Sequence, residues 1–444
     1  MTTLYTKGTV ICKLWDAFSK YFSEQTKPTA QHLFELVLSI LALNGYQSVR
    51  FLHEHFIRKI SENSLNSYYF ALNESKIDLN GWIEKLISAA LAVMPPQFSE
   101  QPVVLAIDDT MVEKFGKSFE YRSRLFDHAA HNGSNYLDGH CFVSLLMNVP
   151  VEGSQYLPVP VGYRMWDKSQ SKLEIAADLV RTAMKMIGTE RSVVLCCDSW
   201  YPKGAVCGLI QEYKNLTLIC NVRSDTVLYD LPPEKTGKRG RPRKKGERLE
   251  LSQISRSDIP GTDYSVGLRS VKTNLFGDQT VTAIVTKAKS ENSIRLFLST
   301  EPAERIPFSL DFLHQKTALA YPQANPALLP LAIYSLRWSI EVTYYEQKTF
   351  WGLSSYMIQR KTGIERLVNL LSLIFAALTL LPFQSQDFST LREKSPQEIR
   401  FTLGQLVQQQ VFLTAFDSGA QSGYIAKFTL EYLISAASHL GVVA

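Results

Sequence analysis

The pattern of apolar and polar positions changes along the chain. From residue 30 to residue 95, apolar residues recur at helical spacing, as in AQHLFELVLSILAL (30–43). Between residues 103 and 300, short apolar runs such as VVLAIDDT (103–110) and SVVLCCDSW (192–200) alternate with helical patterns. Strand-like runs separated by helices are typical of an α/β core. The sequence therefore predicts an α/β fold with helical N- and C-terminal regions.

A change of composition interrupts this core. Residues 223–291 are rich in Gly, Pro and charged residues and contain short alternating segments, which predicts a small β-rich insertion. We therefore expect five segments: a helical, DNA-binding N-terminal region (1–95), the first part of the core (96–222), the β-rich insertion with a basic loop (223–291), the second part of the core (292–384) and a helical C-terminal region (385–444).

One apolar run requires a choice between a membrane span and a core helix. LVNLLSLIFAALTLLPF (367–383) has 17 residues and contains Asn369 and Ser372, so it is short for a membrane span. We expect it to be a buried helix against a sheet. The N-terminal segment lacks the basic and apolar regions of an export signal. These patterns predict a cytoplasmic protein with no membrane partner.

The six cysteines include no CxxC pair and show no regular spacing. This pattern fits reduced thiols better than a disulfide framework or a zinc site. Cys196 and Cys197 alternate across an apolar strand, and we expect both to pack in the core. His128, His131 and His140 fit no firm ligand spacing, which favours a loop over a metal site.

The net charge of +5 would not by itself identify a nucleic-acid-binding protein, but its distribution is uneven. Residues 234–248 hold eight Lys and Arg against two Glu. The segment KRGRPRKK (238–245) is similar to an AT-hook, whose Arg-Gly-Arg enters an A·T minor groove. The alternative is a solvated loop tip. The basic residues that we expect to contact DNA are Lys238, Arg239, Arg241, Arg243, Lys244 and Lys245.

Three carboxylates lie on the predicted core elements, two of them at strand ends and one on a helix. Asp108 or Asp109 ends one predicted strand, Asp198 ends another, and Glu341 lies on the predicted helix 334–348. Sites of open α/β sheets lie at the carboxyl ends of strands. Carboxylates without a cysteine or histidine cluster suit Mg²⁺ or Mn²⁺. Taken singly, however, a carboxylate at a strand end is more often a turn or helix cap.

On that helix, Tyr334, Arg337, Glu341 and Lys348 share one arc beside an apolar stripe. Their spacing matches, at each step, the Tyr-(2)-Arg-(3)-Glu-(6)-Lys signature of the DDE transposases of bacterial insertion sequences, and the chain resembles the insertion-sequence-four-like group of that family. AIDDT looks like the family's first-aspartate strand, which would make Asp109 the ligand. CCDSWY resembles the second-aspartate segment, which would give Asp198.

The resemblance implies an RNase H-like catalytic core, a mixed sheet flanked by helices and interrupted by a β-rich insertion. It also implies two Mg²⁺ (or Mn²⁺) ions per active site, held by Asp109, Asp198 and Glu341. Tyr334, Arg337 and Lys348 would position DNA phosphates.

The implied reaction is cut-and-paste transposition. Water would attack the phosphodiester at the element's end, and the freed 3′-hydroxyl would attack the opposite strand or the target. The implied partners are double-stranded DNA, as terminal inverted repeats and target, and a second copy of the chain in a homodimeric synaptic complex. The implied location is the bacterial cytoplasm, at the nucleoid. Two alternatives stay open, namely a domesticated DNA-binding protein that has lost catalysis and an RNase H-like nuclease without strand transfer.

In one place the sequence departs from the family pattern. Hairpin-forming relatives stack a flipped base on a tryptophan in the strand before the glutamate helix, where this chain has SIRLFLSTEP with Arg295. Arg295 could stack in its place, or Trp338 or Trp351 could substitute, so a hairpin intermediate is an open question.

The two terminal regions also allow more than one interpretation. The helical pattern of residues 48–72 fits either a helix-turn-helix reader of DNA or helices that only pack on one another. The Gln-rich stretch LGQLVQQQVFL (403–413) fits either self-association or packing on the core.

Overall fold

The computed structural model describes residues 6–45, 47–127, 135–233, 243–291 and 293–422. The chain forms two compact units. The first comprises Met1–Leu86, Met111–His140 and Tyr344–Ala444, and the second comprises Ile87–Thr110 and Cys141–Thr343. Each unit combines segments that are distant in sequence, and the five segments expected from composition stay a prediction.

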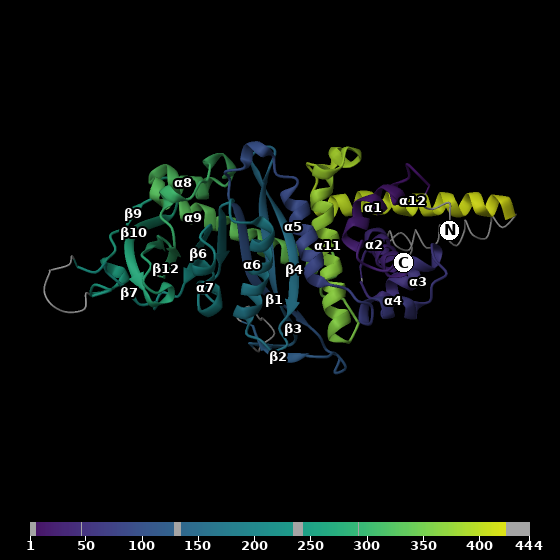
Figure 1. Ribbon diagram of the computed structural model, residues 1–444, viewed down its shortest axis with the longest axis horizontal. Coiled ribbons are helices and arrows are strands. Elements are labelled where there is room, and N and C mark those ends of the chain that lie inside the picture. The colour runs from purple at the N-terminus through teal and green to yellow at the C-terminus, as the bar shows by residue number, and fades with distance from the viewer. Residues whose placement is uncertain (1–5, 46, 128–134, 234–242, 292, 423–444) are drawn as a thin grey trace. The chain divides into compact units, whose positions relative to one another are not determined.

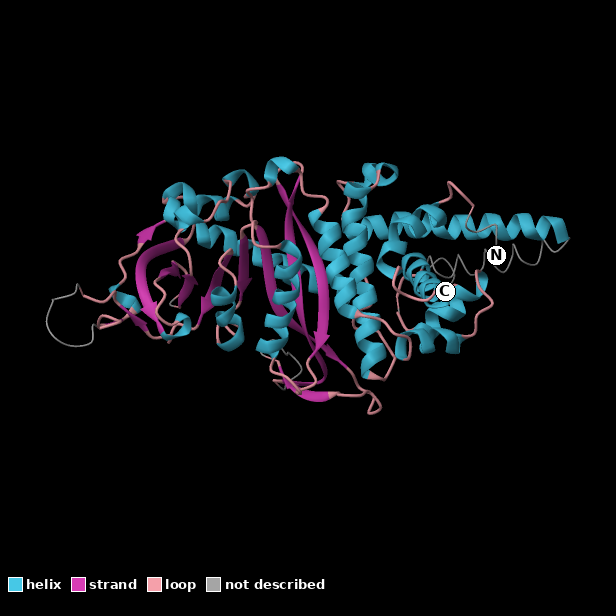
Figure 2. Cartoon of the chain, viewed as in Figure 1, coloured by secondary structure: helices cyan, strands magenta, loops and turns pink. Residues whose placement is uncertain are grey.

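The second unit is built on one continuous sheet, with helices against it (Figure 1, Figure 2). Its strand order is β3-β1-β5-β6-β12-β11-β10-β7-β8, with β4 paired to β3 and β9 to β10. The short β2 pairs with the first residues of β3, which belong to the first unit. The strands are β1 (Val103–Glu113), β2 (Ser123–Phe126), β3 (Tyr136–Val151), β4 (Gln155–Met165), β5 (Val193–Cys197), β6 (Leu216–Val222), β7 (Leu228–Tyr229), β8 (Arg248–Leu249), β9 (Ser257–Asp258), β10 (Tyr264–Thr273), β11 (Val281–Ala288) and β12 (Ile294–Ser299).

The central strands are parallel and the outer ones antiparallel. β1 pairs with β5 and β5 pairs with β6 in parallel. β12 pairs antiparallel with β6, β11 with β12, and β10 with β11. All five residues of β5 are buried, because central parallel strands are covered on both faces. The mixed α/β fold class is thus confirmed. The β-rich insertion continues the same sheet, since β11 pairs with β12 along six residue pairs.

Among the described residues of the second unit, the α-helices that lie wholly within it are α6 (Lys172–Ile187), α7 (Gly204–Glu212), α8 (Lys316–Ala324) and α9 (Leu329–Tyr334). The expected helix 334–348 is not continuous. A 3₁₀ turn at Ser335–Arg337 separates α9 from α10 (Trp338–Thr349). Leu329 and Ile333 of α9 pack on Val104, Val194 and Ile219 of the sheet. This packing places the start of the Tyr334–Lys348 segment over one face of β1 and β5.

The first unit is mainly helical. Its helices, together with α5, which crosses from one unit to the other, are α1 (Val10–Ser19), α2 (Lys27–Ala42), α3 (Val49–His55), α4 (Leu65–Asn73), α5 (Leu79–Leu91), α11 (Lys361–Gln384) and α12 (Pro396–Ser422). Among the described residues, α11 alone is long and apolar enough to cross a membrane, and 89% of its most apolar stretch is buried. The expected burial is confirmed. Within its unit, α11 packs on the helices α4 and α12, and its expected contact with a sheet stays a prediction.

The C-terminal helix α12 docks on the end of α2. The last carbonyls of a helix have no partner within it and need donors from elsewhere. Arg400 of α12, buried to 1% exposure, donates from Nε to the carbonyl of Ile40 at 3.0 Å and from Nη2 to that of Leu43 at 2.6 Å. Gln408 donates to the carbonyl of Ala42. Part of the Gln-rich stretch is therefore used for packing on the core.

The close approach of α12 to α2 generates a stability prediction. A Cβ added at Gly404 would lie 2.2 Å from the carbonyl oxygen of Leu41. Although alanine favours a helix over glycine by about 1 kcal/mol, the clash should dominate, and we expect Gly404→Ala to destabilise by about 1–3 kcal/mol. Thermal unfolding followed by circular dichroism measures the effect.

The matched control is Gly208→Ala in α7, where an added Cβ has no neighbour within 4 Å. That variant should keep its stability or gain up to about 1 kcal/mol. If both variants gained stability, the close packing of α12 on α2 would be contradicted.

Candidate active site

The two neighbouring aspartates of β1 face opposite sides of the sheet. Successive side chains of a strand alternate between faces, so Asp108 lies on the face of Val104, which packs on α9. Asp109 lies on the other face. β1 continues to Glu113, beyond the expected end, but its pairing with β5 stops at Ile107↔Cys197. Asp108 and Asp109 therefore come directly after the last residue pair between β1 and β5, and Asp198 comes directly after the end of β5.

A single guanidinium joins two of the carboxylates. Arg337, in the 3₁₀ turn, donates from Nη1 to Asp108 Oδ2 at 3.1 Å and from Nη2 to Glu341 Oε1. The side chains of Arg337, Asp108 and Glu341 are only 12%, 18% and 33% exposed. Arg337 Nε is buried without a hydrogen-bond partner among the described residues. Arg337 and Glu341, two members of the expected polar arc, thus lie at the sheet edge where Asp108 and Asp198 lie.

Two carboxylates of this cluster have raised pKa values, chiefly because they are buried. Burial, and next the charge of Asp198, raise the pKa of the Asp108 carboxyl to about 7, although Arg337 acts to lower it. Burial also raises the pKa of Asp198, with the charge of Asp109 contributing in the same direction. Asp108, Asp198 and Glu341 carry three formal negative charges against the one positive charge of Arg337. A formal excess of two negative charges remains.

Asp109 has a different set of partners. Its carboxylate accepts from Lys172 Nζ at 2.8 Å, from the hydroxyl of Tyr201 at 2.9 Å and from the thiol of Cys141 at 3.1 Å. Lys172 is the first residue of α6, on the opposite side of the sheet from α9. Burial and Asp109 raise the pKa of the Cys141 thiol. The charge of Asp109 is therefore already balanced by Lys172.

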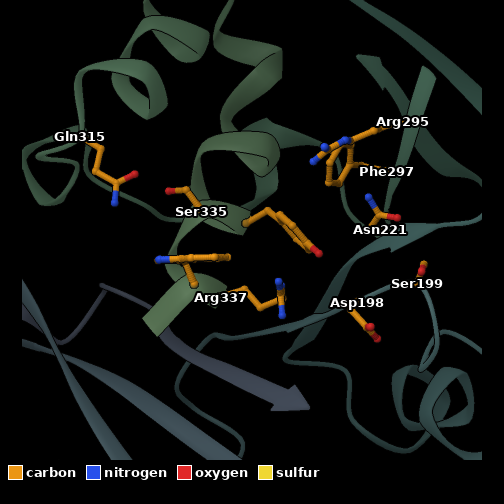
Figure 3. A pocket seen from close by; sticks show the side chains of 10 residues that line it. Asp198, Ser199, Asn221, Arg295, Phe297, Gln315, Ser335 and Arg337 are labelled. Carbon is orange, nitrogen blue, oxygen red and sulfur yellow. The ribbon is translucent and has the colours of Figure 1, made fainter. Parts of the chain in front are cut away.

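A pocket of about 570 Å³ opens beside the Arg337 cluster (Figure 3). Its residues come from β6 and β12, from the residues after β5, from Gln315 just before α8, and from the run that ends α9 and begins α10. They are Asp198, Ser199, Asn221, Arg295, Phe297, Gln315, Tyr334, Ser335, Arg337 and Trp338. Arg295 and Trp338, two of the three side chains considered for base stacking, thus line the same pocket. The third, Trp351, is fully buried against Phe375 and is not accessible to a base.

Two further residues of the signature lie on the same run of helix and turn. The hydroxyl of Tyr334 donates to the carbonyl of Cys197 at 3.3 Å, next to Asp198. Burial raises the pKa of this hydroxyl. Lys348 is half-buried near the end of α10. Their expected role in phosphate binding stays a prediction.

The basic loop is only partly within the described residues. Lys238, Arg239 and Arg241 lie outside them. Arg243 pairs with Glu247 at 3.2 Å, Lys244 pairs with Asp278, and Lys245 donates to Asn274. The DNA contact expected of the loop stays a prediction, and in this structure Arg243 and Lys244 meet carboxylates.

The histidine and cysteine expectations are resolved for the described residues. His140 is buried in β3, where Nδ1 lies 2.6 Å from the hydroxyl of Tyr356. His128 and His131 lie outside the described residues. All six cysteines are free, and Cys196 and Cys197 are fully buried, as expected.

Sequence reasoning missed Lys172, Tyr201 and Cys141 around Asp109. A signal for one of them was present, because Tyr201 belongs to the CCDSWY segment quoted for Asp198. Lys172 carried no comparable signal, because the residues around it (SKLEI, 171–175) do not indicate that it pairs with Asp109, 63 residues earlier in the chain.

Comparison with known families identifies the class of protein. The model of the DDE superfamily endonuclease family matches residues 18–263, more than half of the chain. The chain belongs to the DDE superfamily endonucleases. No curated protein matches the chain significantly. The matched segment contains Asp108, Asp109 and Asp198, whereas Glu341 lies beyond it.

A DDE superfamily endonuclease is a metal-dependent nuclease that acts on DNA, and its members typically use divalent ions. The mixed sheet flanked by helices is consistent with the RNase H-like fold expected above. Transposase or nuclease activity follows at this general level.

The carboxylate cluster of this endonuclease fits a divalent cation by its donor chemistry. Carboxylate oxygens are the ligands that Mg²⁺ and Mn²⁺ prefer, and the cluster carries more negative than positive formal charge. In their present positions, however, no three described His, Cys, Asp or Glu side chains could hold a metal ion together. Arg337 stands between Asp108 and Glu341, so metal binding there requires Arg337 to move.

The raised pKa of Asp108 predicts an unusual pH dependence of stability in the presence of EDTA. Between about pH 4 and about pH 7, the folded protein keeps a proton on Asp108 that the unfolded chain has released. Stability therefore falls as pH rises through this window, and the penalty is complete above it. Asp108→Asn should be more stable than the parent by about 1–3 kcal/mol near pH 8 and by less near pH 5.

Urea unfolding at the two pH values tests this expectation. Asp225→Asn, at an exposed aspartate of the same unit, is the matched control and should show the same small effect at both. Equal stability of Asp108→Asn and the parent near pH 8 would contradict the excess of negative charge in the cluster.

Proposed function

We propose that this DDE superfamily endonuclease is the transposase of a bacterial insertion sequence and carries out cut-and-paste transposition. The observation that carries the proposal is the largely buried cluster of Asp108, Asp198 and Glu341 around Arg337, at the carboxyl ends of two adjacent parallel strands. The Tyr-Arg-Glu-Lys spacing supports the assignment to the insertion-sequence-four-like group.

The proposed metal ligands are Asp198, Glu341 and one aspartate of β1. The resemblance implied Asp109, and Asp109 stays a candidate. Asp108 is the aspartate that shares a face with Asp198 and a guanidinium with Glu341, which supports it as a second candidate. Two Mg²⁺ or Mn²⁺ ions, when bound, would activate the attacking oxygen and stabilise the leaving one.

The other residues of the cluster would handle DNA phosphates. Arg337 presents a planar fork of donors that fits a phosphate as well as it fits two carboxylates. When it moves away from Glu341, a phosphate in the pocket beside Asp198 would be its natural new partner. Arg295 and Trp338 line that pocket and would contact the nucleotide next to the cleaved bond.

In the proposed reaction, water hydrolyses the phosphodiester at the element's end and leaves a 3′-hydroxyl. This hydroxyl then attacks a phosphodiester of the target, and no covalent bond to the protein forms. Terminal inverted repeats and target DNA are the proposed partners, and two copies of the chain would bring two ends together. The proposed location is the bacterial cytoplasm, at the nucleoid.

Substitution of the carboxylates tests the catalytic assignment. We expect Asp198→Ala and Glu341→Ala each to lower Mg²⁺-dependent nicking of element-end DNA by more than about 1,000-fold, because each removes a metal ligand. DNA binding, measured by gel shift, should survive. The control is Glu304→Ala, at an exposed carboxylate of the same unit.

The same assay separates the two aspartates of β1. If Asp108 is the ligand, Asp108→Ala abolishes nicking and Asp109→Ala only reduces it, and the reverse result assigns Asp109. Retained cleavage in Asp198→Ala or Glu341→Ala would reject the proposed ligand set. A gel shift by the parent protein without any cut in Mn²⁺ would favour a DNA-binding protein that has lost catalysis.

A strand-transfer assay tests the second step. With pre-cleaved ends that carry a free 3′-hydroxyl, Mg²⁺ and a plasmid target, a transposase should give joined products, which a gel resolves. An end that lacks the 3′-hydroxyl is the control and should give none. Cleavage of intact ends without joining would identify a nuclease that does not transfer strands.

A further inference from the structure

We propose that a surface beside Asp109 binds an unpaired stretch of DNA, with a base stacked on Trp200 and phosphates held by Lys168 and Lys203. The inference rests on the proposed function, because it takes DNA at the active site as the ligand. The surface, called here the tryptophan–lysine cluster, consists of Trp166, Lys168, Lys172, Trp200 and Lys203.

Trp200 connects this cluster to the carboxylates. It follows Asp198 by two residues, and its backbone N–H donates to Asp198 Oδ1 at 3.0 Å. Its side chain is nevertheless 40% exposed. The Nζ of Lys203 lies 4.4 Å from the centre of the Trp200 ring, and the Nζ of Lys172 lies 5.2 Å from it. An accessible aromatic ring with ammonium groups at its surface thus stands next to the candidate active site.

Trp166 extends the cluster along the end of β4. The Nζ of Lys172 is 5.0 Å from its ring centre and that of Lys168 is 5.7 Å away. Lys168 has a positive φ of 70°, which a lysine rarely adopts. This backbone conformation at an exposed lysine fits a functional constraint on the loop.

Two of the three lysines of the cluster form no ion pair with another described residue. Lys172 is balanced by Asp109, whereas Lys168 and Lys203 are exposed and form no ion pair with another described residue. The acidic residues nearest in sequence accept hydrogen bonds from serines of their own loops. Asp167 accepts from Ser169, and Glu174 accepts from Ser171 in the capping box of α6. Asp167 and Glu174 keep their own negative charges, but neither forms an ion pair with Lys168 or Lys203, so these two ammonium groups stay accessible to an anion.

An unpaired DNA strand is the anion that uses both parts of this surface. Proteins bind single strands through cationic side chains along the phosphates and aromatic rings on which bases stack. Bases within a duplex are already stacked on each other and offer no free face to Trp200. An acidic peptide would satisfy the lysines but would leave the indole unused. Strand separation at a cleaved end supplies unpaired nucleotides at this position.

Fluorescence anisotropy of the full-length protein tests the proposal, with a labelled oligo(dT) strand and a blunt duplex of the same length as probes. EDTA is present, so no cleavage occurs. We expect Trp200→Ala to weaken binding of the single strand by about 5- to 100-fold, the loss of one stacked base, and duplex binding to change less than twofold. Trp200→Phe keeps an aromatic ring and should keep most of the affinity.

The lysines are tested through salt dependence. Lys203→Gln should lower the slope of log K against log salt for the single strand by about 0.7, the value of one phosphate contact. Lys214→Gln, at an exposed lysine just after α7, and Phe401→Ala, at an aromatic residue of α12 that is 51% exposed, are matched controls and should bind as the parent does.

The outcomes separate this inference from the proposed function. Unchanged single-strand binding by Trp200→Ala overturns the inference, whether or not the parent cleaves DNA. Equal losses for single strand and duplex also overturn it, because they indicate a general electrostatic effect. Selective loss in Trp200→Ala, with Trp200→Phe and both controls near the parent, supports it even if nicking assays fail.

Discussion

The candidate site depends on the alternation of side chains along β1, combined with the parallel register that sets β1 beside β5. Because neighbouring residues of a strand face opposite ways, Asp108 and Asp109 enter two different environments although they are adjacent. The register Ile107↔Cys197 brings Asp198 next to Asp108. A shift by one residue would exchange the two aspartates between faces and leave Arg337 opposite a different carboxylate.

Burying these carboxylates is electrostatically unfavourable, and the groups that stabilise their charge differ between the two faces of the sheet. The charge of Asp109 is balanced, because one ammonium, one hydroxyl and one thiol donate to its carboxylate. Around Arg337, one guanidinium serves two carboxylates while Asp198 stands close by. Buried carboxylates without matching positive charge are rarely retained for stability, and they are common where a cation or a phosphate has to be received.

Local patterns in the sequence predicted the helices and strands well, because periodicity and apolar runs are local signals. α2 and β5 both fall where the pattern put them. The division into compact units was not visible, because it depends on which distant segments pack together. The same is true of α11, whose apolar composition predicts burial but not its helical partners, and of the 3₁₀ turn at Ser335–Arg337, which has no glycine or proline to announce it.

The site itself was predictable in its residue types but not in its pairings. The carboxylates, Arg337 and Tyr334 carry a signature in the sequence. No such signature distinguishes Asp108 from Asp109, because the face on which each lies depends on the pairing register of β1 with β5. The partner of Asp109, Lys172, comes from a third segment of the chain. Side chains that meet across such distances leave no local pattern.

The two sides of this sheet edge differ in the charged groups that they present, and the difference is useful for a nuclease. The Arg337 cluster carries an excess of negative charge and suits a metal cation, whereas the tryptophan–lysine cluster presents two exposed lysines without an ion pair among the described residues, which suit phosphates. If both signs were mixed on one face, the lysines would pair with the carboxylates of the Arg337 cluster. The alternation of β1 prevents this, because it places Asp109 beside Lys172 and leaves Asp108 on the side of Arg337 and Glu341. If Asp108 is the metal ligand, as one of the two proposed assignments has it, two consecutive acids suit this edge better than one, because Asp108 would face the metal while Asp109 pairs with Lys172.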